Sequence, residues 1–170
     1  MRIIHCTQKL IKELGNPPIQ SPDSSLNTEG LGNWYCNLLR IDRRKCLLFT
    51  NENTLYSFLI PNVMKKNLMN FQDEFLINLN LNLQAEGFNI EVVNKVMQEY
   101  TDIGFAKTAS KHILGAMTQL SFEYEVLIQM KEGLENVKVL DMNRDINRTI
   151  LKGIKYLHPI EAMRDLLSNL

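Results

Sequence analysis

The sequence has few cysteines, the residues whose disulfide bonds stabilise small secreted domains. Only 3 of its 170 residues are cysteines, and no CxxC pair or Cys/His ligand spacing occurs. An odd number of cysteines without such spacing argues against a disulfide framework and against a structural zinc site. We therefore expect buried free thiols, and a reducing cytoplasm as the compartment.

Long apolar runs and net charge are missing too. No stretch reaches the roughly 18 consecutive apolar residues that suggest a membrane-spanning helix, and the first residues lack the apolar segment of a secretion signal. Lys and Arg together number 19, and Asp and Glu also number 19. The whole molecule therefore has no strong field that would attract a polyanion.

The known signatures of catalysis and cofactor binding are also absent. The sequence contains no GxSxG, Walker or dinucleotide-binding fingerprint, and its three histidines show no HxH or HExxH spacing. We expect no metal site and no cofactor.

The chain does contain a strand-rich N-terminal third, followed mostly by helical patterns. Short apolar runs separated by turn residues predict strands near 2–6, 34–41, 46–50 and 54–60. We expect an α+β fold in which a small antiparallel meander sheet is packed by about five helices, mostly C-terminal. The length fits a single domain, residues 1–170.

Between the first two strands, residues 16–33 are rich in Pro, Ser and Gly and predict a loop. A loop of this length inside a compact domain is functional or mobile. A short helix over residues 8–14 precedes it, with Gly15 as the exit.

Helical spacing predicts a helix from Leu68 to Gly87, although apolar residues and asparagines alternate over residues 76–83, which also fits a strand. Length and the glycine favour the helix. Further helices are expected to begin at Asn89, Ser110, Asp141 and Pro159. Residues 102–108 fit an irregular or extended connection, and residues 137–140 fit a last short strand.

The densest charge cluster is Arg43-Arg44-Lys45, in the predicted hairpin turn over residues 42–45. Adjacent cations repel one another unless an anion lies between them, and arginine holds a phosphate through two parallel hydrogen bonds. A second cluster is the basic ridge Arg144, Arg148 and Lys152, spaced four residues apart on the helix after Asp141. Each cluster also fits an ordinary solvated surface. If they are adjacent in space, they form one anion site.

A candidate pocket is formed by His5, Cys6, Trp34, Tyr35 and Asn147. Neighbours on a strand point to opposite faces, so His5 and Cys6 cannot serve each other as base and nucleophile. The simpler interpretation is that these side chains are buried and seal the sheet.

Several motifs resemble an uncharacterised family of bacterial proteins, a stand-alone domain of unknown function. The similarity rests on residues 3–10, 34–51, 114–117, 147–149 and 158–162. It covers nearly the whole chain. The resemblance implies no activity, cofactor or site residue.

Three functions from different classes therefore stay open. The first is a binding module for a phosphate-bearing ligand or nucleic acid, using the hairpin turn and the helix ridge. The second is an enzyme of unrecognised class with a site near His5, Cys6 and Asn147-Arg148. The third is a protein-interaction domain or homodimer without a membrane contact.

Overall fold

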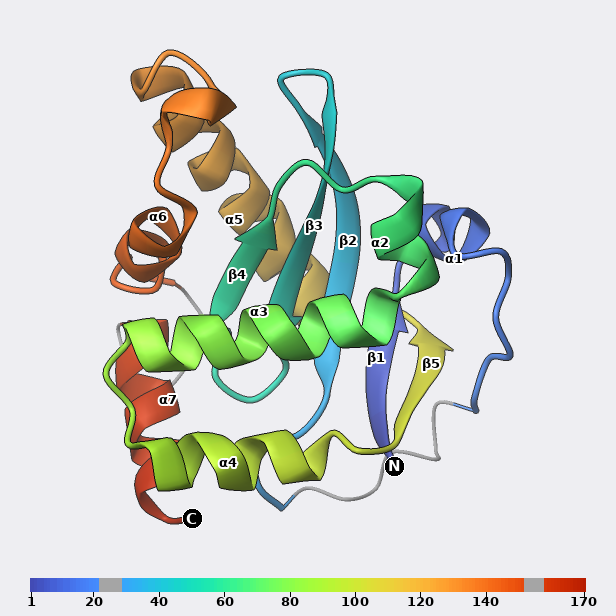
Figure 1. Ribbon diagram of the computed structural model, residues 1–170, viewed down its shortest axis with the longest axis vertical. Coiled ribbons are helices and arrows are strands. Elements are labelled where there is room, and N and C mark those ends of the chain that lie inside the picture. Colours follow the sequence, from blue (N-terminus) through green and yellow to red (C-terminus); the bar gives the residue numbers. More distant parts are fainter. Residues whose placement is uncertain (22–28, 152–157) are drawn as a thin grey trace.

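The computed structural model describes residues 1–21, 29–151 and 158–170, which form a five-stranded sheet with helices on both faces (Figure 1). The α+β class is confirmed. The strands are β1 (Arg2–Cys6), β2 (Trp34–Ile41), β3 (Arg44–Asn51), β4 (Ser57–Ile60) and β5 (Ile103–Lys107).

The sheet is mixed rather than a pure antiparallel meander. Its order is β4-β3-β2-β1-β5, and the predicted meander holds for β2, β3 and β4. The prediction was wrong for β1, which pairs in parallel with both β2 and β5. Residues 102–108, expected as an irregular or extended connection, are extended and contain β5. Their pairing in the sheet was not predicted, because the partner strand β1 lies about a hundred residues earlier and no local pattern indicates it.

The helices follow the predicted order with shifted ends, except that the single helix predicted from Leu68 to Gly87 is two helices that meet at Asn70. They are α1 (Gln8–Glu13), α2 (Lys65–Met69), α3 (Phe71–Ala85), α4 (Ile90–Glu99), α5 (Lys111–Met130), α6 (Val139–Ile146) and α7 (Pro159–Ser168), with a 3₁₀ turn η2 (Leu134–Asn136). The helical prediction for residues 76–83 is confirmed within α3. Asn89 and Ser110 cap α4 and α5 with side-chain oxygens, as expected.

Two predictions near the C-terminus were wrong. Residues 137–140 are not a strand, because Val137 is the C-cap of η2 and α6 already begins at Val139. α6 begins at Val139 and ends at Ile146, rather than running from Asp141 to Lys152. Lys138 is its N-cap, and Asn147 is its C-cap, where the helical hydrogen bonds stop.

Each face of the sheet buries its own core, because successive side chains of a strand point to opposite faces. Trp34, Cys36 and Leu38 of β2 pack with α1, α2, α3, α4 and α7. Tyr35 and Ile41 of the same strand pack with α5 and α6. The result is three layers, with α3 and α4 in front of the sheet in Figure 1 and α5 behind it.

Both edges of the sheet are covered. Asn143 and Asn147 on α6 face the edge strand β4, where their Oδ1 atoms accept the backbone N–H groups of Leu59 at 3.0 Å and Ser57 at 2.8 Å. Asn147 Nδ2 also donates to the Ser57 carbonyl at 2.7 Å. At the opposite edge, the backbone N–H of Gln20 donates to the carbonyl of Phe105 in β5. Covered edges do not pair with further strands.

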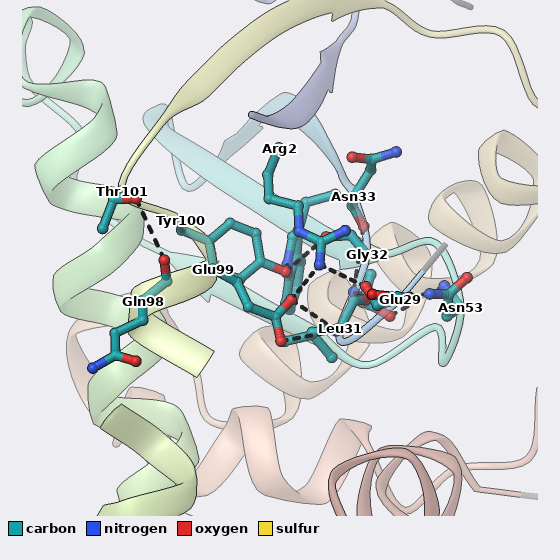
Figure 2. A network of polar contacts seen from close by, with 12 residues as sticks. Arg2, Glu29, Leu31, Gly32, Asn33, Asn53, Gln98, Glu99, Tyr100 and Thr101 are labelled. Atoms are coloured by element: carbon teal, nitrogen blue, oxygen red, sulfur yellow. Dashed lines mark hydrogen bonds and ion pairs between the residues drawn. The ribbon is translucent and has the colours of Figure 1, made fainter. Parts of the chain in front are cut away.

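A second polar network fastens the end of the long loop to the sheet and to α4 (Figure 2). The buried Arg2 donates to Glu99 at 2.7 Å, and the Glu99 carboxylate accepts the backbone N–H of Leu31. Gly30 has a φ of 68° at this point, and a Cβ there would collide with that carboxylate. The part of the loop that the structure describes is therefore tied down at both ends.

Candidate anion-binding surface

The hairpin between β2 and β3 rises above the rest of the sheet as a two-stranded arm (Figure 1). Its loop is only Asp42-Arg43, shorter than the predicted turn, because Ile41 already pairs with Arg44. Both loop residues have positive φ, 50° and 64°, as the tightest hairpin turns require. The Asp42 carboxylate accepts the backbone N–H of Leu134 at 2.6 Å, which anchors the arm to η2.

The three adjacent cations of the arm point in different directions. Arg44 donates to Asn62 at 3.1 Å and lies 3.9 Å from the Glu135 carboxylate. Lys45 contacts Glu13 of α1 at 2.8 Å. Arg43 is exposed at the tip, and no ion pair is found for it among the described residues. The cluster Arg43-Arg44-Lys45 therefore does not close around a single point.

Lys45 instead joins a basic surface that α1 contributes. The Lys45 ammonium is the main cause of a lowered pKa for the Glu13 carboxyl, through their hydrogen bond, and Arg40 and Lys9 lower it further. One exposed carboxylate thus lies within the field of cations from α1, β2 and β3. Together with Lys12 on α1 and Arg43 at the tip, these residues form what we call the arm patch: Lys9, Lys12, Arg40, Arg43 and Lys45.

Sequence reasoning missed Arg40, Lys9 and Lys12. Arg40 was in reach, because a two-residue hairpin loop makes Arg40 and Lys45 direct cross-strand partners on one face. Two like charges at such positions destabilise the hairpin unless an anion lies between them. No local signal indicates that α1 packs beside this pair.

The basic ridge on α6 is neutralised from within the protein. Arg148 makes two parallel hydrogen bonds to Glu86, at 3.2 and 2.8 Å, and Arg144 lies 3.9 Å from the same carboxylate. The Glu86 side chain has no exposed surface, and its hydrogen bonds raise the pKa of Arg148. Lys152 lies outside the described residues. Among the described residues, the contacts of this ridge and those of the arm involve different partners, and no side chain is shared between the two predicted clusters.

The residues of the predicted pocket are divided between the two faces of the sheet. His5 stacks on Tyr35 with ring centres 4.5 Å apart, and its Nδ1 lies 3.1 Å from the Lys107 carbonyl. Cys6 and Trp34 are buried in the opposite core, where the Trp34 indole donates to the Tyr100 hydroxyl at 2.8 Å. Asn147 holds the edge strand.

Burial raises the pKa of the Cys6 thiol to about 12, so the sulfur stays protonated at neutral pH. A protonated, buried thiol is a poor nucleophile. Clefts of about 410 and 390 Å³ occur elsewhere, between α5 and α6 and between α3 and α4. In the described parts of the chain, no three side chains of His, Cys, Asp or Glu come close enough together to hold a metal ion.

Comparison with known proteins identifies the family but not a function. A family model described as a domain of unknown function (DUF6933) matches residues 3–162, so the chain belongs to that family. Neither the curated proteins nor the solved structures contain a match. Of the helices that the structure describes, none combines the length and apolar character needed to cross a membrane.

Proposed function

We propose that this member of the family is an anion-binding module whose ligand carries phosphates, with nucleic acid as the expected ligand. The arm patch is the binding surface. The observation that carries the proposal is the meeting of cations from three separate segments around Glu13, whose pKa they lower. The proposal places the protein in the cytoplasm, consistent with its three free, buried cysteines.

The arm patch keeps an excess of cations beyond the internal ion pair between Lys45 and Glu13, which supports a polyanionic ligand. Lys45, Arg40 and Lys9 all act on the Glu13 carboxylate, although the whole chain carries no net charge. Two further carboxylates, Asp42 and Glu125, line a cleft with Arg40. Arg40, Arg43, Lys9 and Lys12 are exposed, so they can reach a ligand without rearrangement. A row of phosphates would place negative charge between the cations of the hairpin. Binding would also release the counterions that surround the phosphates.

The five residues of the arm patch are all Lys or Arg, and one exposed aromatic side chain, Phe122, lines a cleft with Arg40. Contacts to the phosphate backbone position a nucleic acid without reading its sequence. We therefore expect binding that depends on salt and varies little with sequence.

The test is fluorescence anisotropy with labelled oligonucleotides at low salt. The triple variant Arg40→Ala/Arg43→Ala/Lys45→Ala should raise the Kd about tenfold or more, because three phosphate contacts are lost. The matched control, Lys111→Ala/Lys131→Ala/Arg164→Ala, removes three exposed cations from α5, its C-cap and α7, and should leave the Kd within about twofold. The proposal fails if the wild type does not bind at low salt, or if the control weakens binding as much as the arm variant does.

A further inference from the structure

A cleft of about 210 Å³ lies between α5 and the hairpin arm, and it shares Arg40 with the arm patch. The helix contributes Phe122, Glu125 and Gln129, which a spacing of three and four residues places on one side of α5. Asp42 of the hairpin loop also lines the cleft. A ligand that the arm patch holds at Arg40 is therefore next to this cleft as well.

Phe122 gives the cleft an aromatic ring that is in contact with solvent. Its side chain is 67% exposed, and of the aromatic side chains that the structure describes it is the only exposed one. Ile41 and Ile128, both buried, line the same cleft and make part of its wall apolar. A ring beside a basic surface is the arrangement by which proteins bind unpaired bases, because the bases stack on the ring while the cations hold the phosphates.

The charges around the cleft distinguish the two parts of a nucleotide. The cations of the arm patch attract its phosphates, whereas the carboxylates of Asp42 and Glu125 repel them. The Asp42 carboxylate is held in place by the Leu134 N–H at 2.6 Å. The exposed amide of Gln129 offers both a donor and an acceptor, so it can pair with the edge of any base. The part of a nucleotide that fits the cleft is therefore the uncharged base.

We propose that this cleft holds an unpaired base stacked on Phe122, so that single-stranded nucleic acid gains a contact that a duplex lacks. The inference rests on the proposed function, because the arm patch must hold the phosphates. In a duplex the faces of the bases are covered by their neighbours, and only the phosphates are available. Every base has a face that can stack, so the contact agrees with binding that varies little with sequence.

The test compares labelled single strands, as DNA and as RNA, with a DNA duplex of the same sequence by fluorescence anisotropy at low salt. Phe122→Ala should raise the Kd for both single strands about tenfold and leave the Kd for the duplex within about twofold. The matched control Phe122→Tyr keeps a ring and should bind single strands within about twofold of the wild type. Alanine is the best helix former, so α5 should stay folded, which circular dichroism checks.

A spectroscopic signal tests the contact directly. The variant Phe122→Trp supplies a fluorescent ring whose emission should be quenched by a bound single strand and not by the duplex. Trp34 is buried, so the wild type gives the baseline.

The stacking proposal is overturned if Phe122→Ala binds single strands as tightly as the wild type, if it loses duplex binding equally, or if a bound single strand does not quench Phe122→Trp. In these cases the arm patch still stands as the binding surface, provided that Arg40→Ala/Arg43→Ala/Lys45→Ala weakens both ligands. A wild type that binds neither ligand instead overturns the proposed function, and the stacking proposal with it.

Discussion

Single residues show how this protein keeps charge out of its core or pairs it there. Glu86 has no exposed side-chain surface, and Arg148 satisfies it with two hydrogen bonds. A buried carboxylate without a partner is strongly destabilising. Arg148 is therefore needed for the fold. In the sequence alone its internal partner Glu86 cannot be recognised, and for this reason the basic ridge suggested a ligand site.

Because the cysteines are buried, the free energy of unfolding decreases as the pH rises into the alkaline range. The pKa of Cys6 is 9.0 in its ordinary state and about 12 in the folded protein. Below pH 9 the thiol is protonated in both states, so its contribution is fully present. Between pH 9 and 12 only the unfolded chain loses the proton, which favours unfolding by up to about 1.4 kcal/mol per pH unit.

We therefore predict that Cys6→Ala loses about 1.4 kcal/mol less stability than the wild type between pH 7 and pH 10. Urea unfolding at the two pH values measures this difference. The buried Tyr124, whose pKa burial also raises, acts with the same sign in both proteins and cancels in the comparison. An identical loss in wild type and variant would show that Cys6 does not titrate on unfolding.

Among the elements, α6 acts as a substitute strand for the edge of β4. Asn143 accepts from the backbone of Leu59 and from the Tyr124 hydroxyl, and it donates to Asn82 on α3. Asn147 exchanges hydrogen bonds in both directions with Ser57. Two asparagines four residues apart thus reproduce on a helix part of what a neighbouring strand would offer.

Replacing Asn147 with leucine should lower the free energy of unfolding by about 2–3 kcal/mol, because the buried N–H and carbonyl of Ser57 both lose their partner. The urea midpoint should fall at an unchanged m-value. Asn94→Leu, at an exposed position on α4, is the matched control and should change stability by less than about 0.5 kcal/mol. Equal effects of the two substitutions would mean that the Ser57 groups find other partners.

How well each element could be predicted depends on how local its determinants are. The β2–β3–β4 meander and the helices after Asn89 and Ser110 were predicted, because alternation, turns and caps lie within a few residues of each element. β5 was missed because it becomes a strand only through β1. α6 was misplaced because Asp141, a typical cap, lies inside it, while Lys138 begins it without a capping side chain.

The residues of the candidate site also differ in how local their determinants are. Arg43 and Lys45 were recognised from their position at a turn, whereas Lys9 joins the arm only through the packing of α1 beside it. The internal partner of Arg148 was invisible for the same reason, since Glu86 lies 62 residues away.

At the scale of the whole molecule, a chain without net charge concentrates cations on one projecting arm. The family has no assigned activity, and the two clefts of about 400 Å³ lie away from His5 and Cys6. We therefore base the proposed function on the cations of the arm rather than on chemistry in a pocket.

The most direct measurement is the slope of log Kd against log salt concentration for a labelled duplex. Each phosphate contact adds about 0.9 to that slope, so the variant Arg40→Ala/Arg43→Ala/Lys45→Ala should show a slope smaller than the wild type's by about 2–3. A wild-type affinity that does not change with salt, or an equal slope in the variant, would contradict the claim that the arm patch binds phosphates.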